Sequence, residues 1–137
     1  FMQPIPPANV KVGLPLNLKP KFFPVAGDAA AKLIIAVDAA DGSDAAMAIT
    51  GRILAACWAE ERDIASAATL AELLAEAGLP ATRLDESRQP VVDKLYGHYT
   101  RQAIAAGVFG APSYLVDGEI FWGQDRLDFL QRRLERP

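Results

Sequence analysis

Hydrophobic residues recur at intervals of three and four through the middle of the chain, which is the spacing of one buried face on an α-helix. Ser66 is a good N-cap for the last of these helices, and Gly78 followed by Pro80 stops it. Ser43 or Asp44 is the expected N-cap of the second helix. We predict helices over residues 28–41 and 67–77, and between them a helix that begins after its cap and ends near Trp58.

A further helical region follows a short helical turn that we expect over residues 82–87. Gln89 and Pro90 form a typical pair for the N-cap and first position, and Gly107 ends the helix that they open. The residues predicted to share one face of this helix are Val92, Leu95, Tyr99, Gln102 and Ala106.

The hydrophobic pattern changes to an extended one near the C-terminus. Residues 113–116 and 119–121 are predicted strands on either side of Asp117 and Gly118, a pair that favours a two-residue type I′ turn. Because an isolated two-stranded hairpin is marginally stable in water, these strands need further sheet beside them. A last helix is predicted to begin at about Gln124 and to bury Leu127, Leu130 and Leu134.

The composition excludes several classes of function. With 137 residues and 51% hydrophobic content, the chain suits one globular domain. Its net charge of −3 is spread over interspersed acidic and basic residues, so we expect no nucleic-acid partner. The apolar runs fall far short of the ~20 residues that a membrane span needs, so we expect no membrane partner.

Cysteine and histidine each occur once in the sequence, and neither indicates a catalytic or metal site. Cys57 lies on the apolar stripe of the second predicted helix and is interpreted as a buried structural residue. A single cysteine excludes an internal disulfide and a Cys-x-x-Cys motif, and it suits the reducing cytoplasm. His98 has no second ligand residue at a suitable spacing, so we expect no metal site.

Proline content and helical pattern together suggest three segments. Residues 1–25 are a proline-rich lead-in or the junction of a fragment, residues 26–80 a helical insertion subdomain, and residues 81–137 a C-terminal helix, hairpin and helix. Because the predicted sheet is incomplete, we expect the full protein to be longer than this chain or the chain to be partly ordered.

The segment before the first predicted strand is suited to binding a peptide. Pro112 follows Gly107 and Gly110 closely, and a proline in this place is a candidate for a cis bond to Ala111. Such a bond turns the N–H and C=O of Ala111 outward, where they pair with an extended thiol peptide as in strand addition. The alternative is a trans proline that starts an edge strand.

The start of the last helix is the second candidate site. The N–H groups of Gln124 and Asp125 are expected at the positive end of the helix dipole, which stabilises a ligand carboxylate. The Asp125 side chain beside them suits an ammonium group next to that ligand carboxylate. The alternative is that Gln124 or Asp125 caps the helix.

Residues 107–127, with the sequence GVFGAPSYLVDGEIFWGQDRL, resemble the C-terminal signature of 2-hydroxychromene-2-carboxylate isomerases, relatives of the kappa-class glutathione transferases in the DsbA-like superfamily. The similarity extends upstream through residues 58–60, 23–24 and 13–15, and so covers residues 11–135. It implies an α/β thioredoxin-like fold of the DsbA and kappa glutathione transferase type with a helical insertion, here lacking the N-terminal half of the sheet.

The resemblance also implies a cofactor and a reaction. Glutathione is the implied cofactor, with Ala111 and Pro112 binding its cysteinyl unit and Gln124 and Asp125 its γ-glutamyl end. The implied reaction is the cis-trans isomerisation of an aromatic hydroxy-enone acid in aromatic catabolism, carried out by a homodimer. The family's strand-helix-strand start, with its thiol-activating serine, has no counterpart here, so we name no catalytic residue.

Three other interpretations stay open. A kappa-like glutathione transferase uses the same bound thiolate on other electrophiles. A DsbA-like thiol-disulfide oxidoreductase keeps the fold and requires a Cys-x-x-Cys motif in an N-terminal part that precedes these residues, where the resemblance implies either cysteine or serine. A non-enzymatic helical module leaves the proline turn a purely architectural role.

Overall fold

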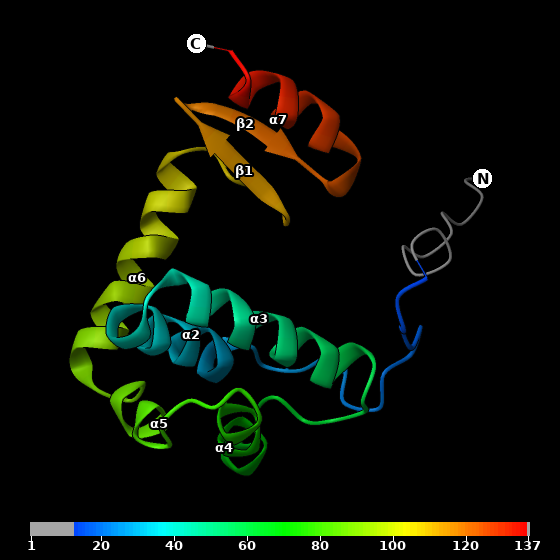
Figure 1. The fold of residues 1–137 in the computed structure, drawn as a ribbon. Helices are drawn as coiled ribbons and strands as arrows, with labels where there is room; N and C mark the ends of the chain where they lie inside the picture. The colour runs from blue at the N-terminus through cyan, green and yellow to red at the C-terminus, as the bar shows by residue number, and fades with distance from the viewer. Residues whose placement is uncertain (1–12, 137) are drawn as a thin grey trace. The chain divides into compact units, whose positions relative to one another are not determined.

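The computed structural model describes residues 13–136. The chain forms two compact units, which divide between Tyr96 and Gly97. The first unit contains α2 (Asp28–Asp41), α3 (Ser43–Trp58), α4 (Ala67–Glu76), α5 (Thr82–Glu86) and the beginning of α6 (Pro90–Ala105) (Figure 1). The second unit contains the end of α6, β1 (Ser113–Val116), β2 (Glu119–Trp122), the 3-10 turn η1 (Gln124–Arg126) and α7 (Leu127–Leu134).

The boundary between the units lies within α6. The predicted division into residues 1–25, 26–80 and 81–137 stays a prediction, and the first twelve residues of its proline-rich lead-in lie outside the described residues. No helix in the described range is long and apolar enough to cross a membrane.

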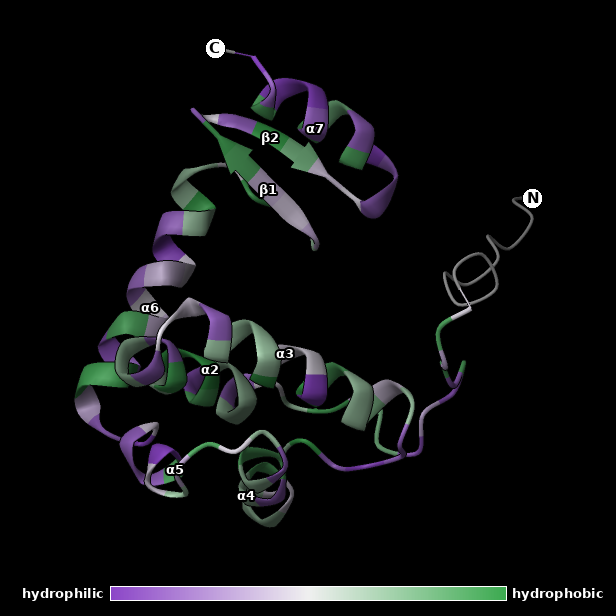
Figure 2. Cartoon of the chain, in the orientation of Figure 1, coloured by the Kyte–Doolittle hydropathy of each residue, from purple (hydrophilic) through white to green (hydrophobic). Residues whose placement is uncertain are grey.

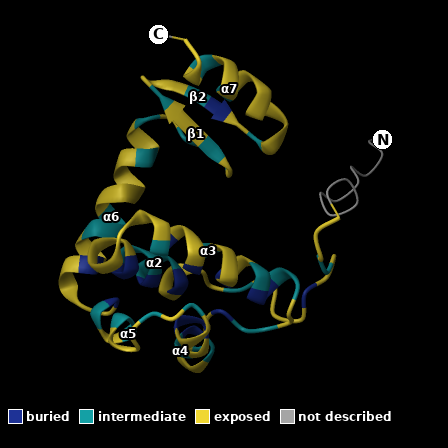
Figure 3. Ribbon diagram, in the orientation of Figure 1, coloured by how far each residue is buried: buried dark blue, intermediate teal, exposed yellow. Residues whose placement is uncertain are grey.

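The core of the first unit is formed by α2, α3 and α4. Leu33 and Val37 of α2, Ile49 of α3, and Leu70 and Leu74 of α4 are each at most 1% exposed. Figure 3 shows the buried residues of this unit gathered on these helices. Burial of each such aliphatic side chain contributes about 1.5–3 kcal/mol, so the predicted amphipathic faces are confirmed and hold the unit together.

The junction between α2 and α3 differs from the prediction in its cap. Gly42 occupies the N-cap position of α3, with a φ of 91° and no side-chain cap hydrogen bond. Ser43 is already the first residue of the helix, so the expected cap at Ser43 or Asp44 is wrong. The reason is that the chain turns at one glycine, which adopts a positive φ at little cost, and no separate capping residue lies between the helices.

The predicted N-cap of α4 is confirmed, and the helical turn predicted over residues 82–87 forms α5. Ser66 caps α4, and its hydroxyl accepts a hydrogen bond of 3.5 Å from the Thr69 N–H. Arg83 of α5 donates from Nε and Nη2 to the two carboxylate oxygens of Asp41, at 2.7 and 2.9 Å. This paired contact ties α5 to the end of α2, and it lowers the pKa of the Asp41 carboxyl.

The predicted buried face of α6 is confirmed at its beginning and not along its length. Val92 is buried and Leu95 is half-buried, but Tyr99 and Gln102 are exposed. Because α6 passes from one unit into the other between Tyr96 and Gly97, its residues do not share one continuous core.

The hairpin of the second unit is an antiparallel pair in which Ser113 lies opposite Trp122 and Tyr114 opposite Phe121. Asp117 and Gly118 have φ values of 49° and 81°, as a type I′ turn requires. The predicted hairpin is therefore confirmed, with β2 extending one residue further, to Trp122.

The last helix starts as predicted but does not bury its leucines. Leu127 is 46% and Leu134 63% exposed, whereas Leu130 is half-buried. Figure 2 shows α7 as mostly hydrophilic with separate hydrophobic patches. A hairpin of two strands offers too little surface to cover the apolar face of α7, and among the described residues of this unit Phe121 alone is buried.

Candidate ligand-binding site

The segment that precedes β1 adopts the backbone path that the sequence predicts. The peptide bond between Ala111 and Pro112 is cis. The Ser113 hydroxyl donates a hydrogen bond to the Gly110 carbonyl, at 2.5 Å. The Gly123 N–H donates to the Pro112 carbonyl at 2.9 Å. One hydrogen bond therefore closes a turn around the cis peptide, and the other attaches the segment to the residue that follows β2.

Gly110 is a glycine because an indole ring lies against it. A Cβ at this position would stand 2.5 Å from Nε1 of Trp122. The Trp122 ring also contacts the ring of Phe109, with 5.1 Å between the centroids. The indole thus sets the path of the backbone just before Ala111.

The backbone of Ala111 is accessible to a ligand. Ala111 and Pro112 are both exposed. Within residues 13–136, neither the N–H nor the C=O of Ala111 takes part in a hydrogen bond. An exposed donor and acceptor on one residue are what an extended peptide needs for antiparallel pairing.

The second predicted part of the site lies in the 3-10 turn η1. Gln124 and Asp125 are exposed, and the turn is preceded by Gly123 with a φ of 93°. A Cβ on Gly123 would lie 2.5 Å from Oδ1 of Asp125, so the carboxylate folds back over the glycine. Neither η1 nor α7 has a side-chain cap hydrogen bond, so capping does not occupy these side chains.

The structure brings the two predicted parts of the site together through the backbone. Pro112, which precedes β1, and Gly123, which follows β2, are joined by the 2.9 Å hydrogen bond. Ala111 and Gln124 are the neighbours of these two residues in the sequence. The four predicted residues therefore belong to one end of one hairpin.

A hollow of about 310 Å³ beside β2 is lined by residues that are not among the predicted site residues. Trp122, Arg126 and Phe129 line it, and the Arg126 guanidinium lies 5.5 Å from the centre of the Phe129 ring. Trp122 is 51% and Phe129 47% exposed, so both rings are open to an aromatic ligand. The sequence signal for this hollow is Arg126, directly after Asp125, with the aromatic residue Phe129 three positions further along.

Residues 13–136 place neither a thiol nor a metal centre at this site. Cys57 is 3% exposed in the first unit, where burial raises the pKa of its thiol and the charge of Glu61 raises it further. Its thiolate population at neutral pH is therefore small. His98 is exposed, and residues 13–136 contain no group of His, Cys, Asp and Glu side chains arranged to hold a metal ion.

A protein-family model described as a DSBA-like thioredoxin domain matches residues 1–135. The 2-hydroxychromene-2-carboxylate isomerase of Sphingobium xenophagum is 48% identical over 60 residues, which are 43% of this chain and 31% of that protein. The match thus spans about a third of the length of this curated relative.

Two solved structures resemble the chain over most of its length. The structure of a 2-hydroxychromene-2-carboxylate isomerase has a TM-score of 0.72 at 22% identity and covers 92% of this chain and 60% of that one. The cytosolic disulfide reductase DsbM from Pseudomonas aeruginosa has a TM-score of 0.67 at 24% identity and covers 95% of this chain and 75% of that one. At these identities the similarity establishes the fold, and it confirms the predicted thioredoxin-like class.

Proposed function

The chain belongs to the DSBA-like thioredoxin domain family, and from this membership we propose that it takes part in a glutathione-dependent cis-trans isomerisation of 2-hydroxychromene-2-carboxylate-type acids. The observation that carries the proposal is the 48% identity over 60 residues to an isomerase of that name. A homodimer in the cytoplasm is part of the same proposal.

The exposed backbone of the second unit is the proposed glutathione site. The N–H and C=O of Ala111 pair with the cysteinyl unit, and Pro112 holds them in place. The N–H groups of η1 bind the γ-glutamyl carboxylate, and the Asp125 carboxylate binds the adjacent ammonium group. The absence of a competing hydrogen bond at Ala111 within residues 13–136 supports this assignment.

The chemistry that glutathione would supply when bound is a thiol for reversible addition to the enone and release from it. The residues of this chain bind and orient that tripeptide. Fixing a reactant in this way removes translational and rotational freedom that the reaction would otherwise have to overcome. The aromatic rings of Trp122 and Phe129 offer a surface for an aromatic acid beside the same hairpin.

The proposal is tested by following the isomerisation of 2-hydroxychromene-2-carboxylate with and without glutathione. We expect a rate that depends on glutathione and that is lost in Ala111→Pro, which removes the N–H donor. Ala111→Ser keeps the donor and is expected to keep the rate. Melting temperatures of both variants show whether each is folded. A rate without glutathione, or equal rates in two folded variants, contradicts the proposal.

A thiol-disulfide oxidoreductase is the second candidate, because the DsbM structure shares the fold. That activity needs an accessible thiolate, and the single cysteine of the sequence is buried with a raised pKa. Cys57 is therefore not suited to supply that thiolate, and the oxidoreductase would need a Cys-x-x-Cys motif outside these residues. Reduction of insulin disulfides by this protein would favour the second candidate instead.

A further inference from the structure

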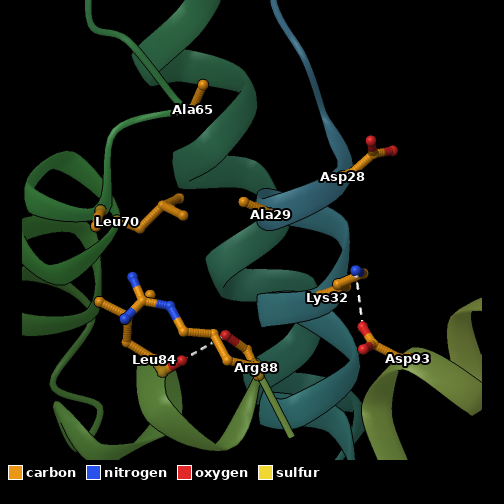
Figure 4. A pocket seen from close by; sticks show the side chains of 10 residues that line it. Asp28, Ala29, Lys32, Ala65, Leu70, Leu84, Arg88 and Asp93 are labelled. Carbon is orange, nitrogen blue, oxygen red and sulfur yellow. Dashed lines mark hydrogen bonds and ion pairs between the residues drawn. The ribbon is translucent and has the colours of Figure 1, made fainter. Parts of the chain in front are cut away.

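The first unit contains a cavity of about 370 Å³ whose lining includes none of the residues proposed to bind glutathione. It is formed by α2, α5, the beginnings of α4 and α6, and the segment before α4 (Figure 4). Ala29, Ala65, Leu70 and Leu84 give it apolar walls. Its volume lies within the roughly 300–1,000 Å³ of small-molecule sites.

The carboxylates that line the cavity already have partners. Asp28 accepts a hydrogen bond of 2.6 Å from the Tyr96 hydroxyl, and this bond raises the pKa of Tyr96. Asp93 forms an ion pair of 2.7 Å with Nζ of Lys32, and the hydrogen bond within that pair raises the pKa of Lys32. Figure 4 shows this ion pair at one side of the cavity. A cationic ligand would therefore find no free carboxylate.

Arg88 is the charged lining residue that has no partner within residues 13–136. Figure 4 shows its side chain extending into the part of the cavity that Leu70 and Leu84 line. A guanidinium offers a rigid fork of N–H donors, which matches the two oxygens of a carboxylate. The unpaired charge and the apolar walls thus meet in one place.

We propose that this cavity binds a small amphiphilic carboxylate, with its two oxygens on Arg88 and its apolar body against Leu70 and Leu84. An inorganic anion would leave the apolar walls unused, and a neutral apolar molecule would leave the guanidinium unpaired. The beginning of α4 at Ala67 also lines the cavity, and the positive end of its dipole favours the same sign of ligand charge. The inference does not rest on the proposed isomerisation.

Calorimetric titration of the whole protein with benzoate tests the proposal. Benzoate has the size and charge for the site, and benzamide is its neutral counterpart. We expect benzoate to bind, benzamide to bind at least about tenfold more weakly, and Arg88→Gln to weaken benzoate binding by roughly ten- to a hundredfold. Arg88→Lys is expected to retain part of the affinity.

Arg101→Gln is the matched control, because Arg101 is exposed and lies outside the cavity. This control should bind benzoate like the original protein. Melting curves establish that Arg88→Gln is folded. Absence of benzoate binding at 10 mM, equal affinity for benzamide, or unchanged affinity in folded Arg88→Gln overturns the proposal.

Discussion

The N–H of Gly123 donates a hydrogen bond of 2.9 Å to the carbonyl of Pro112. This bond joins the residue before β1 to the residue after β2, which are the two places where the proposed ligand-binding groups lie. Both partners are backbone atoms, so the spacing of the site does not depend on a side-chain rotamer. Substitutions that change the backbone here should therefore affect ligand binding directly.

Gly123→Ala should weaken glutathione binding. The φ of 93° is unfavourable for alanine, and the new methyl group would meet Oδ1 of Asp125 at 2.5 Å. Because Gly123 also has a ψ of 153°, a combination that only glycine adopts readily, loss of about 1–3 kcal/mol of folding stability is expected from the backbone alone. Because Asp125 must also rotate away, calorimetry should show a glutathione affinity lower by about tenfold.

Gly118→Ala is the matched control for that substitution. Gly118 also has a positive φ, of 81°, but a methyl group there has no neighbour within 4 Å. It should therefore lose about 1–2 kcal/mol of folding stability in urea unfolding and keep the original glutathione affinity. If both variants lose affinity equally, displacement of Asp125 is not the cause.

The sequence predicted the local structure well wherever neighbouring residues determine it. The Asp117-Gly118 turn and the Ser66 cap depend on side chains and φ values within a few positions, and both are confirmed. The N-cap of α3 was wrong because two helices meet at Gly42, which no isolated helix pattern reveals. The exposure of Leu134 was missed because it depends on how much sheet lies beside α7.

Ser66→Ala should lower the free energy of unfolding by about 1 kcal/mol, because it leaves an N–H in the first turn of α4 without its acceptor. Chemical denaturation measures this change. Ser43→Ala is the control, since Ser43 occupies the first helical position of α3 and makes no cap hydrogen bond. It should change stability by only a few tenths of a kcal/mol, and an equal loss in both variants would contradict the assignment of the caps.

Asp41→Asn should change how stability responds to acid. In the folded protein the hydrogen bond from Arg83 lowers the pKa of Asp41, so the unfolded chain binds this proton more tightly. The stabilisation is complete above the ordinary aspartate pKa of about 3.9. It is lost as the pH falls through that value toward the lower folded pKa. Urea midpoints measured between neutral and acid pH should therefore fall less steeply in Asp41→Asn, and identical slopes would argue against the pair.

Cys57 should react slowly with thiol reagents in the folded protein. Burial hides the sulfur and raises the pKa of the thiol, so little thiolate is present at neutral pH. Labelling followed by mass spectrometry should show slow modification under native conditions and rapid modification in urea. Rapid modification of the native protein would show that the first unit opens readily around this residue.

The candidate site could be predicted in part. The local motif placed Ala111, Pro112, Gln124 and Asp125 together because they flank the two strands of one hairpin. The two-residue turn sets the register of Trp122, but the contact of its indole with Gly110 also depends on the path of the segment before β1. The unpaired Arg88 was equally hidden, because pairing just after α5 depends on which residues α2 and α6 bring near it.

Calorimetric titration with glutathione tests the proposed ligand-binding site most directly. It compares the original protein with Asp125→Asn and Asp128→Asn. Both substitutions remove one exposed carboxylate near the start of α7. If Asp125 binds the ammonium group of the ligand, the protein binds glutathione, Asp125→Asn weakens that binding by about tenfold and Asp128→Asn leaves it unchanged. Absence of binding at millimolar glutathione, or equal affinities in the two folded variants, would contradict the proposed site.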